Sequence, residues 1–151
     1  MSRQIRIEFE KGGVVTARLL ENEAPKSCKL IWDALPVQAN VLHAMLNGEE
    51  VFLDTFPMPH EFPPENEHAY VQPGDLGAAA PANHRVNGKC TLPEGCIGFC
   101  LFYGAARPHK AVDQTMDTNL IGKINEIETL RTIGKRIRVH GTERVKITRI
   151  E

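Results

Sequence analysis

Short apolar segments separated by glycine and proline turns run through most of the sequence, and this feature constrains the fold most strongly. Residues 4–9 alternate strictly, with Ile5, Ile7 and Phe9 on one face and polar side chains on the other. Such alternation is typical of a strand with one buried face. Further strands are predicted over residues 14–20, 40–46, 49–53, 68–71, 95–103, 120–124 and 144–150. We therefore expect a mainly β fold.

Two of these regions carry more specific expectations. The segment 95–103 is apolar on both faces, so we expect it to be a central strand. The segment 56–64 holds four prolines and is predicted to be a surface loop without regular structure.

Helical periodicity interrupts the strand pattern twice. The first helix begins near Pro25, which a first helical turn tolerates, and it stops before Pro36. The second has isoleucine or leucine at helical spacing, at positions 124, 127, 130, 133 and 137. One helix thus follows the opening hairpin, and the other precedes the last strand.

The composition fits one domain of ordinary size. The chain has 151 residues, with 18 lysines and arginines and 19 aspartates and glutamates. This balance gives no general attraction to nucleic acid or to an anionic membrane. No apolar stretch is long enough to span a bilayer, and the N-terminal residues lack the apolar core of a signal peptide. We expect a cytoplasmic protein that binds neither nucleic acid nor membrane.

The cysteines and histidines show no metal-binding spacing. Cys28, Cys90, Cys96 and Cys100 are interpreted as free thiols, because a disulfide framework is unlikely without an export signal. In a strand, Cys96 and Cys100 would lie about 13 Å apart, which is too far to share a metal ion. The six histidines form no i, i+4 pair in a predicted helix and no His-x-His in a strand. No metal and no cofactor are therefore predicted.

Several short motifs follow one another in the order seen in the cyclophilin family. They are Glu23-Ala24-Pro25-Lys26-Ser27-Cys28, Leu42-His43-Ala44-Met45-Leu46, Pro73-Gly74-Asp75-Leu76 and Asn119-Leu120-Ile121-Gly122-Lys123-Ile124. Together they cover nearly the whole chain, which therefore resembles a cyclophilin.

The sequence is still more similar to the DUF3830 family, a group of short prokaryotic cyclophilin-like proteins of unassigned function. This resemblance depends on Glu49-Glu50-Val51-Phe52 and Leu101-Phe102-Tyr103-Gly104, besides the motifs above. It implies one cyclophilin-like domain over residues 1–151, folded as a closed antiparallel β-barrel with two capping α-helices. It implies no activity.

The chain departs from cyclophilins at the residues that catalyse prolyl isomerisation. The resemblance places Ala44 where the family has its catalytic arginine, Thr118 at its histidine and Asp113 at its tryptophan. The single tryptophan, Trp32, falls in the first helix and is expected in the core. Since a preorganised cationic donor supplies much of the transition-state stabilisation, we expect negligible isomerase activity in a proline-peptide assay.

A histidine and a carboxylate flank the predicted Asn47-Gly48 turn. His43 and Glu50 are expected to face each other across this hairpin. Such a couple is a candidate for general acid and base catalysis. The alternative is a structural cross-strand ion pair.

Other polar residues are candidates for ligand binding. His84 and Arg85 lie in a polar loop and suit a substrate carboxylate, although a solvated loop tip explains them as well. Tyr103 and Asn119 lie at strand ends and can hydrogen-bond a small ligand, or serve as a core aromatic and a turn residue. Residues 107–110 hold three basic side chains, which indicates an anion site or an exposed loop.

Three functional hypotheses follow. The first is a protein that binds or acts on a small polar or anionic metabolite through His43, Glu50, His84, Arg85, Tyr103 and Asn119. The second is a weak peptidyl-prolyl isomerase or proline-peptide-binding module in which Arg85 or Arg107 replaces the missing arginine. The third is a structural homo-oligomer without catalysis, assembled through the apolar side chains Phe56, Met58 and Phe62. Because of these side chains, we expect a homo-oligomer. The sequence does not decide whether the protein is an enzyme.

Overall fold

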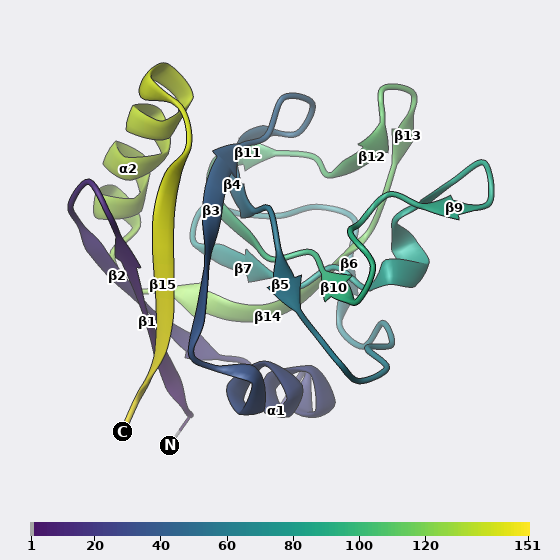
Figure 1. Ribbon diagram of the computed structural model, residues 1–151, viewed down its shortest axis with the longest axis horizontal. Coiled ribbons are helices and arrows are strands. Elements are labelled where there is room, and N and C mark those ends of the chain that lie inside the picture. Colours follow the sequence, from purple (N-terminus) through teal and green to yellow (C-terminus); the bar gives the residue numbers. More distant parts are fainter. Residues whose placement is uncertain (1) are drawn as a thin grey trace.

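Eight antiparallel strands close into a barrel in the computed structural model, which describes residues 2–151 (Figure 1). In chain order they are β1 (Gln4–Phe9), β2 (Val14–Leu19), β3 (Val37–His43), β4 (Gly48–Leu53), β7 (Asp75–Gly77), β11 (Cys100–Ala106), β14 (Thr118–Ile124) and β15 (Glu143–Ile150). Their order around the barrel is β2-β1-β15-β3-β4-β11-β7-β14, and β14 pairs back with β2. The predicted closed antiparallel barrel is confirmed.

The alternation of the first strand has the predicted consequence. Ile5, Ile7 and Phe9 point into the barrel and are buried. They lie in β1, which pairs with β2 on one side and with β15 on the other. The opening hairpin and the last strand thus share one wall of the core.

Two helices complete the barrel, as predicted. Helix α1 (Pro25–Ala34) lies at the end where both chain termini emerge, and α2 (Ile127–His140) packs against β2, β3, β4 and β11 (Figure 1). Gly134 lies in the middle of α2 against the ring of Tyr103, where an added Cβ would come within 2.3 Å of Cε1. The glycine therefore lets the helix approach β11 closely.

The remaining elements are short pieces in the loops. They are β5 (Phe56–Pro57), β6 (Glu67–His68), the 3-10 helix η1 (Pro81–Asn83), β8 (Arg85–Val86), β9 (Lys89–Cys90), β10 (Cys96–Ile97), β12 (His109–Ala111) and β13 (Gln114–Thr115). Strand β8 pairs with β9 and β12 with β13, so each pair forms a small hairpin beside the barrel (Figure 1). None of the helices among residues 2–151 has the length and apolar character needed to cross a membrane.

The predicted strand 95–103 is divided in two. Strand β10 ends at Ile97, and β11 begins at Cys100, because Gly98 pairs with Ala79 through two backbone hydrogen bonds of 2.9 and 3.0 Å. The β11 part lies between β4 and β7, so the expected central position is confirmed.

The proline-rich segment 56–64 folds back onto the barrel, contrary to prediction. Phe56 belongs to β5, which pairs with β10, and its ring stacks on Phe99 with the centroids 4.9 Å apart. Met58 and Phe62 are 5% exposed, and Phe56 is fully buried. These apolar side chains are covered within one chain, so they give no reason to expect a homo-oligomer.

Candidate functional site

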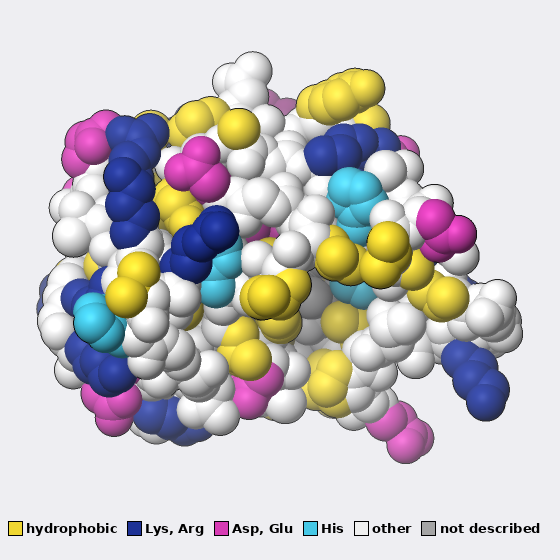
Figure 2. All heavy atoms as spheres, turned by 90° about the horizontal axis from the view of Figure 1, so that it is seen from above, with side chains coloured by type: hydrophobic (Ala, Val, Ile, Leu, Met, Phe, Trp, Pro, Cys, Tyr) yellow, Lys and Arg dark blue, Asp and Glu magenta, His cyan; other side chains and the backbone are white. Residues whose placement is uncertain are grey.

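A cavity of about 460 Å³ opens between the β3–β4 loop, the segment 84–93 and the start of β12. Its apolar wall includes Leu42, Phe52, Leu53, Leu92 and Phe99. Its polar lining consists of His43, Asn47, Glu50, Asp54, His84, Thr91, Cys100, His109 and Lys110. On the end of the barrel where these loops emerge, hydrophobic side chains gather across the middle of the face, with histidine and basic side chains beside them (Figure 2). A small number of polar groups on an apolar wall is typical of a ligand site.

Glu50 is the most deeply buried charged residue of this lining. It is 3% exposed. Asn47 Nδ2 donates a hydrogen bond of 2.7 Å to its Oε1, and the Cys100 thiol lies beside the carboxyl group. Burial raises the pKa of Glu50 to about 7, although Asn47 and Cys100 oppose the rise. The carboxyl can therefore gain or lose a proton near neutral pH.

The Cys100 thiol is the second group that lies beside the Glu50 carboxyl. Burial first, and then the neighbouring Glu50 carboxylate, raise its pKa well above the usual range. The sulfur therefore keeps its proton and is a poor nucleophile. The sequence predicted a free thiol at Cys100, but no local pattern indicated its position beside Glu50.

His43 does not face Glu50, so the predicted cross-strand pair is wrong. The β3–β4 connection spans residues 44–47, and its register places His43 opposite Val51. His43 Nδ1 is 2.8 Å from the Ala44 carbonyl oxygen, which can only accept, so Nδ1 carries the proton. Nε2 lies 2.6 Å from the Tyr103 hydroxyl. Both ring nitrogens are thus occupied, although the ring still lines the cavity.

His84 lines the cavity as a neutral imidazole. Burial first, and then nearby Lys110, lower its pKa to about 4. Its Nδ1 is 3.4 Å from Thr91 Oγ1, and its buried Nε2 has no hydrogen-bond partner among residues 2–151. His84 therefore brings no charge to an anion at neutral pH.

The basic side chains of the segment 107–110 have two different roles. The Arg107 guanidinium donates to the carbonyl oxygens of Ala69 and Met116 at 2.5 and 3.0 Å, so it holds the loop together. His109 and Lys110 line the cavity instead. Lys110 is the one lysine or arginine of the described chain that does so.

Asn47 connects the two sides of the cavity. Besides its bond to Glu50, its Oδ1 accepts a hydrogen bond of 2.8 Å from the His109 backbone N–H. His109 Nδ1 in turn donates to the Arg107 carbonyl at 2.6 Å. The loop that carries Lys110 is therefore tied to the strand that carries Glu50.

The other predicted ligand residues lie outside this cavity. Arg85 is exposed and donates to the Gly88 carbonyl within its own hairpin. Tyr103 is 1% exposed and lies between His43 and Gly134. Asn119 is fully buried, where Nδ2 donates to Ser27 Oγ and Oδ1 accepts from the Asn66 N–H, both at 2.8 Å. In this structure both buried residues hold the core together.

Ala44 lies in the cavity lining, at the position that the resemblance aligned with the cyclophilin arginine. Within residues 2–151, no arginine lines the cavity. The two arginines suggested as replacements, Arg85 and Arg107, are both engaged with backbone carbonyls. In the same part of the chain, no three His, Cys, Asp or Glu side chains are placed to hold a metal ion.

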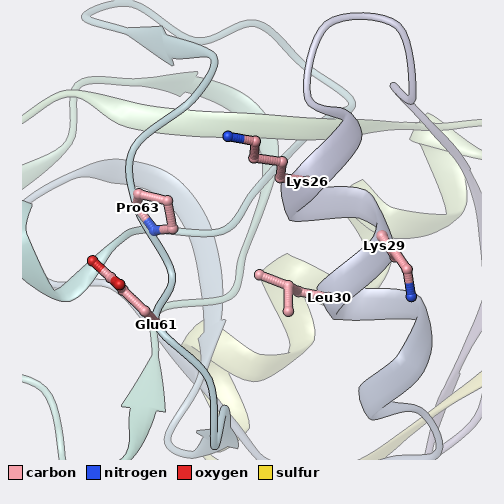
Figure 3. A pocket seen from close by; sticks show the side chains of 5 residues that line it. All are labelled: Lys26, Lys29, Leu30, Glu61 and Pro63. Atoms are coloured by element: carbon pink, nitrogen blue, oxygen red, sulfur yellow. The ribbon is translucent and has the colours of Figure 1, made fainter.

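A second depression, of about 410 Å³, lies beside α1 (Figure 3). Lys26 and Leu30 extend towards Pro63, whereas the Lys29 amino group points away from it. Lys29 is paired with Asp33 on the helix surface. The polar groups of this depression do not converge, so the cavity around Glu50 is the better candidate site.

Residues 7–149 match the family described as "Protein of unknown function (DUF3830)". The chain belongs to the DUF3830 family. No curated protein matches this DUF3830 chain.

Solved structures similar to the DUF3830 chain share its fold. McbB in complex with tryptophan has 17% identity and a TM-score of 0.68, covering 96% of this chain but only 44% of McbB. The hypothetical protein AF2241 from Archaeoglobus fulgidus has 24% identity and a TM-score of 0.63, and the match covers 99% of this chain and 95% of AF2241. A cyclophilin-type peptidyl-prolyl cis-trans isomerase from Cryptosporidium parvum has 15% identity and a TM-score of 0.62, and the match covers 100% of this chain and 99% of the isomerase. The DUF3830 fold is therefore cyclophilin-like.

Proposed function

We propose that the protein binds a small polar metabolite with an anionic group in the cavity around Glu50 and Lys110. The observation that carries this proposal is the Lys110 ammonium, which lines an otherwise largely apolar cavity and forms no salt bridge among the described residues. A volume of about 460 Å³ suits a small metabolite.

The fold neighbours support a small-molecule ligand without identifying it. One of them, McbB, was solved in complex with tryptophan. This likeness concerns the fold, and function follows from a site and not from a fold. The proposal therefore depends on the cavity of this chain.

Catalysis is a finer proposal for the same cavity. If the ligand is turned over, Glu50 is the group suited to move a proton, because its pKa of about 7 lets it act as acid or base near neutral pH. His43, the other predicted catalytic residue, would then serve as part of the wall, since Tyr103 and the Ala44 carbonyl occupy its nitrogens.

No observation favours the proline-peptide alternative over a small metabolite. That alternative requires a guanidinium above the proline ring, and the described part of the chain brings none to the cavity.

Self-association also stays a prediction, now without the apolar segment 56–64 as its basis. Light scattering that shows a monomer at micromolar concentration would contradict it.

A thermal-shift and calorimetry screen with small carboxylates and phosphates tests the proposed function. We expect at least one compound to stabilise the protein by RT ln(1 + [L]/Kd). The substitution Lys110→Met is expected to raise the Kd of that compound about tenfold or more, because one charge-assisted hydrogen bond is lost.

The matched control is Lys89→Met, which removes an exposed lysine of the β8–β9 hairpin that does not line the cavity. This variant is expected to keep the wild-type affinity. If no compound stabilises the protein, or if both variants weaken binding equally, the proposed function is wrong.

A further inference from the structure

The cavity contains acidic and basic side chains that no ion pair within the protein neutralises. Glu50, Asp54 and Lys110 all line it, and none of them forms a salt bridge within residues 2–151. The other buried carboxylates with ion pairs, Asp75 and Glu143, contact Lys123 and Arg136 respectively. Burial without a cation disfavours the ionised form of Glu50, and a cationic ligand group beside it would stabilise that form.

The hydrogen bonds around Glu50 indicate what this partner is. Asn47 donates to the carboxylate, and Asn47 and the Cys100 thiol each lower the pKa of Glu50. Such neighbours favour the ionised form, which can only accept. A third group that completes this arrangement is therefore a donor, and a positively charged donor also offsets the buried charge.

We propose that the ligand is an amino acid or a close ampholyte, whose ammonium group binds Glu50 and whose acidic group binds Lys110. The proposal deepens the proposed function, on which it rests, by adding a cationic nitrogen to the same molecule. The apolar wall, formed in part by Leu42 and Phe99, would then contact an apolar side chain.

The other titratable groups of the lining are less suited than Glu50 and Lys110 to bind the ammonium and the acidic group of the ligand. Asp54 faces the cavity after β4, but its carboxylate already accepts hydrogen bonds of 3.0 Å from Asn40 N and Nδ2. From the segment 84–93, His84 is neutral. From β3, both nitrogens of His43 are bonded. His109 of β12 offers only Nε2, since Nδ1 is bonded to the Arg107 carbonyl.

Binding should be measured first by thermal shift with each standard amino acid at millimolar concentration. For L-phenylalanine, the matched probes are hydrocinnamate, which lacks the amine, and phenethylamine, which lacks the acid; corresponding analogues are used for any other amino acid that binds. We expect the amino acid to bind about tenfold or more tightly than either analogue, because each analogue loses one charge-assisted contact.

Two variants separate the contributions of the charges. Glu50→Gln keeps the shape and the Asn47 contact, and it is expected to abolish the preference for the amino acid over its des-amino analogue. Glu49→Gln removes the same charge from the adjacent residue, which does not line the cavity, and is expected to keep the preference. At about pH 6 the amino acid is expected to release a proton on binding, which calorimetry in buffers of different ionisation enthalpy detects.

The outcomes distinguish this inference from the proposed function. If the des-amino acid binds as tightly as the amino acid, or if Glu50→Gln retains the preference, the amino-acid inference is overturned while the anion site stands. If neither amino acids nor simple acids bind, both are overturned.

Discussion

Two buried glutamates in one barrel meet opposite surroundings. Glu143 of β15 accepts two hydrogen bonds from the Arg136 guanidinium of α2, at 3.1 and 2.6 Å. Glu50 of β4 is equally buried, at 3% exposure for each residue, yet within residues 2–151 its neighbours are an amide and a thiol, and it forms no salt bridge. One carboxylate joins a helix to the barrel, and the other lines a cavity.

The difference separates a buried charge that is used within the fold from one that the proposed function assigns to a ligand. A buried charge that serves the fold is expected to be neutralised inside the protein, because desolvation otherwise opposes folding. Glu143 meets that expectation, and Glu50 does not. Burial and residue type are the same in both, so only the partner distinguishes the two roles.

The largest effect is expected on the structural side of this comparison. Replacing Glu143→Ala leaves the Arg136 side chain, which is 24% exposed, without its carboxylate. We expect the free energy of unfolding to fall by about 3 kcal/mol, the lower end of the range for breaking a buried pair. Urea denaturation measures this loss, and a loss below about 1 kcal/mol would show that the ion pair does not hold the helix.

A smaller effect with a distinctive pH dependence is expected for Glu50. Its pKa rises from an ordinary 4.5 to about 7 on folding, so in this window the folded state holds a proton that the unfolded chain has lost. Stability therefore falls as the pH rises, by roughly 2 kcal/mol between about pH 5 and 7.

Urea denaturation across this range compares the wild type with Glu50→Gln, which lacks the titrating group and is expected to lose this part of the pH dependence. If the wild type and Glu50→Gln showed the same dependence of unfolding free energy on pH, Glu50 would not be the titrating group. The contrast with Glu143 would then be wrong.

The smallest effect is expected at the contact between α2 and Tyr103. Gly134→Ala improves the intrinsic helix propensity, but the new methyl group overlaps the tyrosine ring. We expect a net loss of about 1 to 2 kcal/mol, because the ring or the helix has to shift. Thermal denaturation tests this, and Lys135→Ala at the exposed neighbouring position is the control. A stabilised Gly134→Ala variant would show that the helix moves away at no cost.

The parts of the fold that could be predicted depend on local patterns. Ile5, Ile7 and Phe9 are buried as their alternation required. Leu130, Ile133 and Ile137 are the buried residues of α2 that helical spacing indicated. Local periodicity records which side of an element is buried, so these elements could be found in a single sequence.

The parts that could not be predicted depend on contacts between distant segments. The burial of Phe56 follows from its stacking on Phe99, and no pattern within residues 56–64 reveals that partner. The register of β3 and β4 depends on a four-residue connection, not on the Asn47-Gly48 pair alone, and this register separates His43 from Glu50.

The candidate site was predicted in part for the same reason. Glu50 and His84 do line one cavity, and the basic segment 107–110 contributes His109 and Lys110 to it. The contacts of Asn47 with Glu50 and His109, and the position of the Cys100 thiol beside Glu50, arise only when three separate segments meet. Arg85, Tyr103 and Asn119 looked equally polar in the sequence, but their side chains are used within the fold.

The closure of the barrel between β2 and β14 has a consequence for biosynthesis. Residues 17–19 pair with residues 122–124, and β1 pairs with β15 near the end of the chain. On the ribosome, the first hairpin is made long before the strands that flank it, so both of its edges lack their native partner strands until translation is almost finished. The barrel can therefore close only after nearly the whole chain has been synthesised.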